Sequence, residues 1–443
     1  DFLSSKQIHL EEGSNARLQD DHVTAILTYF APERLQEIVT QSKAEEAVSE
    51  LLFSRLLTYD TTGNLNYDLA ESMTVSEDQK TYTLAIRPDA RWDDGLYVRA
   101  RDVVFTVNLL KNPATRTTLS GWGGIEVSEV DDLTVAFTLP GVYAAFPHAL
   151  RALPILPEHS LRDVEPAQLR ENNFSNNPVG SGAFSLRLFQ NVDGAQGRKV
   201  VHLGRNNDYY RGAAKLDRIQ LHVYKDSDAI KRALATSEVN AASDIPVLTA
   251  NEVNTQRYRV ENQPVNSGVY ALLNTSSATL QDVKVRQALQ LATDTVAIRG
   301  SISKNLPELH LPFINGQITG DVPAAPVVDK QKAATLLEEA GWVLDGAVRK
   351  KDGQALTIAA VTTKNPDFEK ALDILAKQWR DLGVTVTTNI VNPDDPNQNV
   401  AQDVLQPRQY DVLLYQLAIG ADPDVYAYWH GSQATNGYNF SNY

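Results

Sequence analysis

The sequence predicts an α/β protein with mixed sheets and more than one domain. Three observations lead to this class. Strand and helix patterns alternate along the chain, and 443 residues suffice for two or three domains with a core each. The apolar fraction of 42% and the charged fraction of 22% are those of a globular protein. A strand–helix–strand run in the last third adds a parallel pair, because such a crossover packs its helix on one face of the sheet.

The first half of the chain contains two segments with the period-two alternation of strands. Residues 81–86, "TYTLAI", place Tyr82, Leu84 and Ile86 on one face, and "DG" at 94–95 is a turn signal. Residues 131–139 alternate in the same way. Further along, Asp226 is expected to cap a helix whose buried stripe consists of Ile230, Ala233 and Leu234.

The last third alternates between helices and strands. A helix is expected from an N-cap at Asp329 to a stop at Gly341, followed by a strand at 355–361. A second helix ends at Gly383, and strands follow at 384–391 and 410–416. The region from about residue 266 is therefore predicted to be a doubly wound layer. Ligands of such sheets bind at the carboxyl ends of the strands.

Composition and motifs exclude several function classes. The net charge of −14 and the isoelectric point of about 5.1 disfavour a nucleic-acid partner, which needs a basic face. The chain has no cysteine, which excludes thiol catalysis, zinc–thiolate sites and disulfides. No apolar run is long enough to cross a bilayer. No phosphate-binding loop, dinucleotide fingerprint, nucleophile elbow or paired-histidine spacing occurs. We therefore predict no catalytic residue, no metal and no cofactor.

One glycine-rich stretch, "NPVGSGAFSL" at 177–186, needs an explanation of its own. Ser181 lies between Gly180 and Gly182, but the residues that follow alternate like a strand and not like the helix of a nucleophile elbow. The glycines are expected to let the chain turn sharply or approach other backbone closely. Aromatic residues near expected loops are the better pocket candidates. They are Trp122 and the cluster Tyr426, Tyr428 and Trp429.

Several segments together resemble one family, the family 5 extracytoplasmic solute-binding proteins of ABC importers, which bind dipeptides and oligopeptides. The most recognisable run is 51–95, with "DLAES", "SED" and "WDDG". "NPVGSGAFSL" is similar to the family's Asn-Pro-Val-Gly-Thr-Gly segment. "LLNTSSATLQDVKVRQALQLATD", "KAATLLEEAGW" and "YDVLLYQLAIGADPDVYAYW" follow in the family's order over nearly the whole chain.

The resemblance implies a type II periplasmic-binding-protein fold, with two α/β lobes around a cleft and an extra domain. Lobe I would take residues 1–50 and 176–265, the extra domain 51–175, and lobe III 266–443, with a return segment to lobe I expected beyond these residues. Gly180 and Gly182 would serve the crossing between lobes as hinge residues. The implied function is capture of a solute, foremost a peptide, and its delivery to an ABC permease. The protein would be a monomer outside the cytoplasm, with a lipid anchor as its attachment to the membrane.

The expected ligand-binding residues lie on loops and strand ends that would face the cleft. They are Gln41, Ser42, Trp122, Asn274, Tyr415, Gln416, Leu417 and Asp422. One departure from the family bears on the ligand. Its dipeptide and oligopeptide binders carry an Asp that grips the ligand's ammonium, and this position falls at Ile419 or Gly420 here. A non-peptide solute such as an oligosaccharide, a sensor without transport, and a secreted hydrolase with a pair of carboxylates therefore remain alternatives.

Overall fold

The chain forms two compact units, described here from a computed structural model. The units are Asp1–Ile245 and Pro246–Tyr443. The residues that the structure describes are 24–30, 43–60, 64–115, 122–169, 172–193, 198–224, 226–243, 245–261, 267–313, 317–318, 320–392, 398, 400–419, 425–434 and 437–443. The predicted division into lobe I, extra domain and lobe III stays a prediction.

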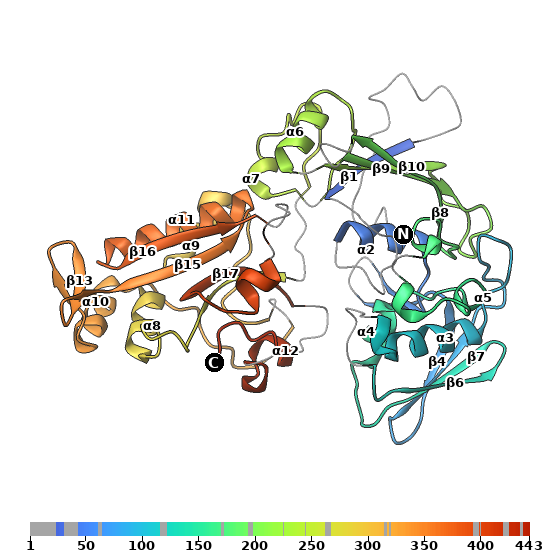
Figure 1. Ribbon diagram of the computed structural model, residues 1–443, viewed down its shortest axis with the longest axis horizontal. Coiled ribbons are helices and arrows are strands. Elements are labelled where there is room, and N and C mark those ends of the chain that lie inside the picture. The colour runs from blue at the N-terminus through green and yellow to red at the C-terminus, as the bar shows by residue number, and fades with distance from the viewer. Residues whose placement is uncertain are drawn as a thin grey trace. The chain divides into compact units, whose positions relative to one another are not determined.

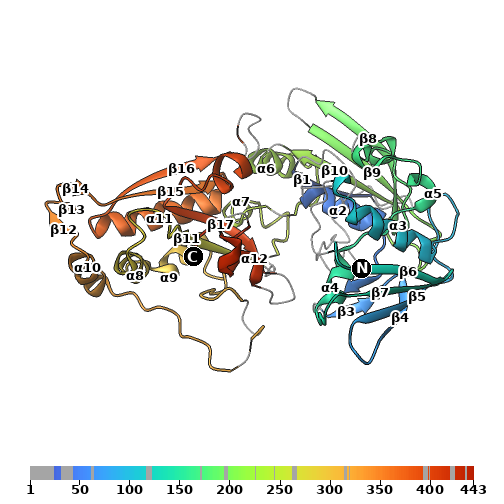
Figure 2. The ribbon, with the colours of Figure 1, turned by 60° about the horizontal axis from the view of Figure 1, so that its bottom comes forward.

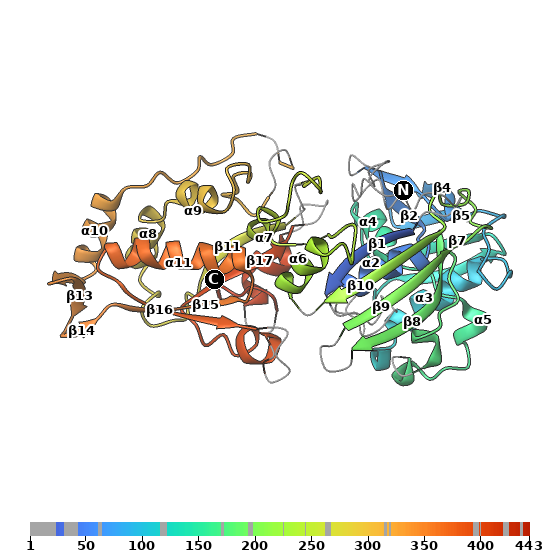
Figure 3. The same ribbon diagram turned by 90° about the horizontal axis from the view of Figure 1, so that it is seen from above.

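The first unit contains two four-stranded sheets (Figure 1). One sheet has the order β1-β10-β9-β8, in which β1 is parallel to β10 and the other pairs are antiparallel (Figure 3). Its strands are Thr24–Phe30, Arg218–Tyr224, Arg198–Arg205 and Phe184–Asp193. The other sheet is antiparallel, with the order β4-β5-β7-β6. Its strands are Ala70–Val75, Thr81–Ile86, Thr134–Thr138 and Glu126–Asp131.

The two strands predicted from alternation are neighbours in this second sheet. β5 follows the predicted 81–86, and its buried residues are Tyr82, Leu84 and Ile86. β7 occupies the middle of the predicted 131–139, and Tyr82 lies opposite Phe137 in the register. Both predictions are confirmed, because one face of each strand is covered by the core and the other is more exposed to solvent.

Five helices and a short hairpin complete the described part of the first unit. The helices are α2 (Lys43–Leu52), α3 (Ala100–Lys111), α4 (Phe146–Ala152), α5 (Glu158–Leu161) and α6 (Ser227–Ala235), and the hairpin is β2 (Leu57–Tyr59) with β3 (Leu65–Tyr67). The predicted cap of α6 is confirmed, since the Asp226 carboxylate accepts a hydrogen bond from the Ala229 N–H at 2.8 Å. One hydrophobic core runs from Val48 to Leu221 and joins both sheets.

The second unit is built on one mixed sheet with the order β11-β17-β15-β16. These strands are Ser267–Leu273, Val412–Ala418, Thr357–Thr363 and Thr385–Val391. β15, β16 and β17 are parallel, and β11 joins the edge antiparallel to β17. The predicted crossover is confirmed, because α11 (Pro366–Asp381) connects the parallel strands β15 and β16.

Helices cover one face of this sheet (Figure 2). They are α8 (Val283–Leu291), α9 (Thr295–Ile302), α10 (Lys330–Glu339) and α11, beside the short α7 (Val247–Ala250) and a small sheet of β12 (Val343–Asp345), β13 (Val348–Lys351) and β14 (Gln354–Ala355). Asp329 caps α10 and Gly341 follows it with φ +88°, as predicted. A second cluster covers the other face, with the π-helical turn Ala401–Leu405, α12 (Tyr426–Trp429) and residues 437–443.

Candidate functional site

The two faces of the second unit's sheet differ in chemistry. β17 alternates between them. Val412 and Leu414 point into the helix-covered core, whereas Leu413 and Leu417 belong to the cluster on the opposite face. The helix-covered core is mostly aliphatic. The opposite face gathers the rings of Tyr270, Tyr415, Tyr428, Trp429, Tyr438 and Phe440, which we call the aromatic face.

The rings of the aromatic face pack edge to face. Tyr270 on β11 and Trp429 at the end of α12 have centroids 5.4 Å apart at 74°. The rings of Tyr415 and Phe440 are 6.1 Å apart at 81°, and those of Tyr438 and Phe440 are 6.2 Å apart at 80°. These geometries are the favoured ones for aromatic pairs. Phe440 is buried, whereas Tyr270, Tyr415 and Trp429 are half-buried and Tyr438 is exposed, so several rings keep surface for a ligand.

Burial alters the tyrosine hydroxyls of this face. Desolvation raises the pKa of Tyr270 to about 12 and raises the pKa of Tyr415. Desolvation also raises the pKa of Tyr428, and the neighbouring Tyr415 and Tyr438 add to that shift. The hydroxyls therefore stay protonated at neutral pH and act as neutral donors and acceptors. Such a surface suits apolar and aromatic groups that carry a few polar atoms.

The structure brings some of the predicted ligand-binding residues together and separates others. Tyr415 and Leu417 share the aromatic face. Gln416 points the other way, since side chains alternate along a strand, and its Nε2 donates to the Ser267 Oγ at 2.6 Å. Trp122 lies in the core of the first unit, 5% exposed, with its ring edge-on to Phe146. Gln41, Ser42 and Asp422 lie outside the described residues.

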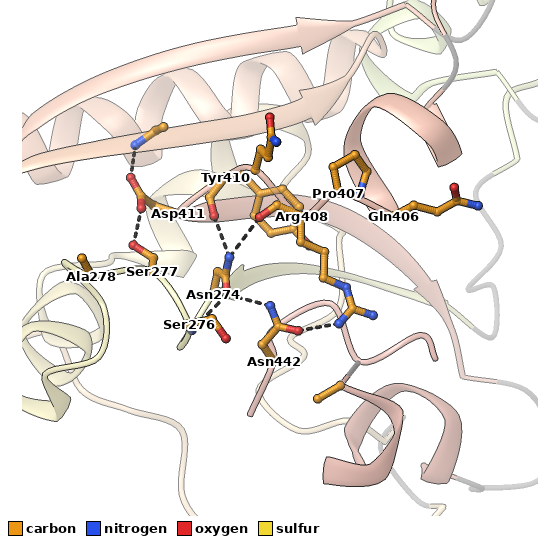
Figure 4. A pocket seen from close by; sticks show the side chains of 13 residues that line it. Asn274, Ser276, Ser277, Ala278, Gln406, Pro407, Arg408, Tyr410, Asp411 and Asn442 are labelled. Carbon is orange, nitrogen blue, oxygen red and sulfur yellow. Dashed lines mark hydrogen bonds between the residues drawn. The ribbon is translucent and has the colours of Figure 1, made fainter. Parts of the chain in front are cut away.

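Asn274 lies at the opposite end of the sheet from Leu417, whereas Tyr415 is in the middle of β17. Asn274 directly follows β11, which is antiparallel to β17, so it lies beside the first residue of β17 instead of the last. There it lines a polar cavity of about 830 Å³, formed within the second unit by Asn274, residues 276–278 and 406–411, Ala359, Ala434 and Asn442 (Figure 4). The aromatic face and this cavity thus offer two different environments, one aromatic and one polar. The predicted ligand contacts themselves stay predictions.

The glycines of the 177–186 stretch lie against the end of α2. A Cβ on Gly182 would collide with the Leu51 carbonyl oxygen and lie 2.7 Å from the Leu52 carbonyl carbon, and one on Gly180 would collide with the Leu52 oxygen. Ser181 is fully buried, and its Oγ accepts a hydrogen bond from the Ser54 N–H at 3.2 Å. As expected for a close approach, these two glycines let their own backbone pack directly against the backbone at the end of α2. Their role as a hinge stays a prediction.

Several ring and polar residues of the site escaped sequence reasoning. Tyr270, Tyr438 and Phe440 are in the aromatic face, and Arg408 lines the cavity. The alternation in "SGVYALL" would have placed Tyr270 on the same face as Leu272 of its strand, but its pairing with β17 joins segments far apart in sequence. The position of the family's ammonium-binding Asp is at or directly after Ile419, which follows β17 and is half-buried.

The described ranges contain no group of three or more His, Cys, Asp or Glu side chains placed to hold a metal ion. In the same part of the chain, no helix combines the length and apolar character needed to cross a membrane.

Comparison with known proteins gives the class of this chain, which is that of the solute-binding proteins. Residues 64–439 match the bacterial extracellular solute-binding proteins, family 5 (middle), and the chain belongs to this family. It is 27% identical over 431 residues to the oligopeptide-binding protein AppA of Bacillus subtilis (strain 168), covering 92% of this chain and 76% of that protein. It is also 25% identical over 358 residues to the nickel-binding periplasmic protein of Escherichia coli (strain K12), covering 76% and 65%.

A solved structure confirms the fold class. The ABC transporter substrate-binding protein CtaP of Listeria monocytogenes superposes with a TM-score of 0.80 at 26% identity, covering 96% of this chain and 84% of that one. The structure of AppA in complex with a nonapeptide superposes with a TM-score of 0.78 at 24% identity, covering 95% and 84%. The predicted type II binding-protein fold with mixed sheets is therefore confirmed.

Proposed function

We propose that this chain captures peptides outside the cytoplasm and delivers them to the permease of an ABC importer. The family supports the binding of a solute. Relatives named as oligopeptide-binding and as ABC transporter peptide-binding proteins, at 27% and 26% identity, support the peptide and the importer. The proposed protein is a carrier without catalytic turnover, because no catalytic motif occurs in the sequence.

The aromatic face is the observation that carries the peptide proposal. Its rings cover one face of the sheet, with Tyr415 and Tyr270 opposite each other on β17 and β11 and with Tyr428 and Trp429 on the helix α12 that follows β17. Ring faces stabilise apolar and aromatic side chains of any sequence, and the protonated hydroxyls of Tyr415 and Tyr428 offer hydrogen bonds to main-chain amides. The Tyr270 hydroxyl already donates to the Leu311 carbonyl oxygen at 2.9 Å. A surface of this kind distinguishes little between peptides of different sequence, which suits a protein that binds many peptides.

We further propose that the ligand's amino terminus is not held by a carboxylate at the position where the family's dipeptide and oligopeptide binders carry one. Ile419 occupies this point, and a buried ammonium without a counter-charge costs several kcal/mol. Acetylation of a peptide's amino terminus should therefore leave its affinity nearly unchanged.

The test is calorimetric titration of the full chain, stripped of bound solute, with defined ligands. The probe is a glycine–serine nonapeptide with one central phenylalanine, and the matched control has serine at that position. We expect the phenylalanine peptide to bind at least tenfold more tightly, with its acetylated form equal within threefold. Binding of nickel chloride with histidine, or of an oligosaccharide, in place of both peptides would overturn the peptide proposal. Recovery of cleaved peptide after incubation would overturn the proposal that the protein only carries peptides, and would favour the hydrolase with a pair of carboxylates.

The remaining parts of the proposal concern partners and location. We propose a monomer that meets the permease outside the cytoplasm and is tethered by a lipid anchor upstream of the present sequence. Light scattering after gel filtration tests the monomer. Uptake of the probe peptide by cells that express the full-length precursor, with and without the permease genes, tests delivery. A chain that binds peptide but supports no uptake would instead favour a sensor.

A further inference from the structure

The last residues of the chain are held by side chains that line the polar cavity. Residues 437–443 carry Tyr438 and Phe440 to the aromatic face. Asn274 and Arg408, next to the ends of β11 and β17, hydrogen-bond to Asn442 of this segment, and we call these three side chains the polar clasp (Figure 4). The clasp and the aromatic face therefore share one stretch of backbone.

All hydrogen-bonding groups of the Asn274 side chain have partners within the protein. Its Nδ2 donates to the carbonyl oxygens of Arg408 at 3.2 Å and of Tyr410 at 2.9 Å. Its Oδ1 accepts from the Asn442 Nδ2 at 2.9 Å and from the Ser276 N–H at 3.1 Å. Two N–H donors and two acceptor lone pairs are the full inventory of an asparagine amide. The side chain is 5% exposed, so it has no group left to offer a ligand.

Arg408 ties the same segment from the opposite side. Its guanidinium donates to the Asn442 Oδ1 and to the Gly437 carbonyl oxygen, the latter at 2.7 Å. Both Arg408 and Asn442 have left-handed backbone, with φ of 51° and 53°. This region is unfavourable for an arginine, and such a conformation persists only when the surrounding contacts hold it.

Three more hydrogen bonds continue the attachment toward Phe440. The Thr275 N–H donates to the Ser441 carbonyl oxygen at 2.8 Å, and the Thr275 Oγ1 donates to the Asn442 oxygen at 2.6 Å. The Tyr410 hydroxyl donates to the Phe440 carbonyl oxygen at 2.8 Å. Phe440 is thereby fixed at 6% exposure against the ring of Tyr415.

We infer that Asn274 is a positioning residue of the solute site and that the polar clasp sets the place of Tyr438 and Phe440 on the aromatic face. The link to affinity rests on the proposed peptide-binding function. Loss of the clasp frees residues 437–443, and the rings they carry then leave the edge-to-face arrangement. A peptide must then order these rings as it binds, and this ordering weakens its affinity.

The test compares Asn274→Ala with a matched control, Asn365→Ala, in the full chain. Asn365 caps α11 in the same unit, accepting from the Asp367 and Phe368 N–H groups, so its loss also costs about 1 kcal/mol of stability. Hydrogen–deuterium exchange without ligand is the first readout, and affinity for the phenylalanine nonapeptide is the second. We expect Asn274→Ala to raise exchange in 437–443 at least tenfold and to raise the Kd at least fivefold. Asn365→Ala should change neither.

The outcomes separate the clasp from the proposed function. Unchanged exchange in 437–443 would overturn the clasp, and lost affinity with unchanged exchange would make Asn274 a direct ligand contact instead. If Asn274→Ala exchanges faster in 437–443 than the wild type, but the wild type binds no peptide, the clasp is supported and the peptide proposal is refuted. If Asn274→Ala does not fold, Thr275→Val removes a single hydroxyl bond to the segment. It should shift exchange in the same direction by a smaller factor, and no shift would again overturn the inference.

Discussion

Gly182 provides a quantitative test of the backbone contact between the 177–186 stretch and α2. In Gly182→Ala the new methyl group would lie 2.7 Å from the Leu52 carbonyl carbon, whereas carbon atoms in contact are about 3.5–4.0 Å apart. The strand or the helix end must move by roughly 1 Å, and such overpacking costs about 1–3 kcal/mol. The movement also weakens the hydrogen bond from the Gly182 N–H to the Leu52 oxygen, now 2.8 Å, for about 1 kcal/mol more. We expect a total loss of about 2–4 kcal/mol.

Urea unfolding of 5-fluorotryptophan-labelled protein, followed by fluorine NMR, measures this loss for the first unit separately from the second. Trp92 and Trp122 report on the first unit, and the other three tryptophans belong to the second. Gly141→Ala is the control, because its Cβ would meet nothing within 4 Å. It should change the free energy of unfolding by less than about 0.5 kcal/mol. A loss below 0.5 kcal/mol for Gly182→Ala would show that the contact is not as close as described.

Three further predictions concern buried groups and the aromatic face. Burial raises the pKa of Asp102, so the folded state favours its protonated form, and the stability that this contributes is lost as pH rises through the raised pKa. The free energy of unfolding of Asp102→Asn, measured relative to wild type, should therefore increase as pH rises from below 3.8. A difference that does not change with pH would contradict this. Trp379→Phe removes an indole N–H that donates to the Leu289 oxygen at 3.1 Å, and urea unfolding of the second unit should show a loss of about 1–3 kcal/mol. Tyr270→Ala should weaken calorimetric binding of the phenylalanine nonapeptide by about tenfold, whereas Tyr67→Ala in the first unit should not.

The elements that were predicted from the sequence are those whose causes are local. Asp226 caps α6 because a carboxylate three residues before an amide reaches it in any helix. The β15–α11–β16 crossover followed from periodicity and from the glycine at 383, whose φ is +95°. The glycines at 180 and 182 were assigned to backbone packing, and the carbonyls of α2 supply the neighbour that the sequence could not name.

The candidate site was less predictable because strand pairing decides it. Asn274 and Tyr415 were expected on one surface, since each occupies a strand end. The antiparallel pairing of β11 with β17 places Asn274 beside the start of β17 and Tyr415 in the middle of that strand, and no local pattern encodes this pairing. Gln416 was grouped with its neighbours, although alternation turns it to the other face. The roles of Arg408 and Asn442 could not be predicted, because neither their left-handed backbone nor their mutual hydrogen bond is marked by a motif in the sequence.

The pairing of β1 with β10 has a consequence for the order in which the first unit is assembled. β8, β9 and β10 follow one another and pair as neighbours, whereas β1 joins β10 only after nearly all of the unit has been synthesised. The equilibrium cost of closing so long a loop grows only logarithmically with its length, so the finished sheet is scarcely weakened. Its kinetics are affected far more, because distant pairings form slowly. As the unit folds, β1 therefore stays unpaired until β10, the last strand of the sheet in the sequence, has formed.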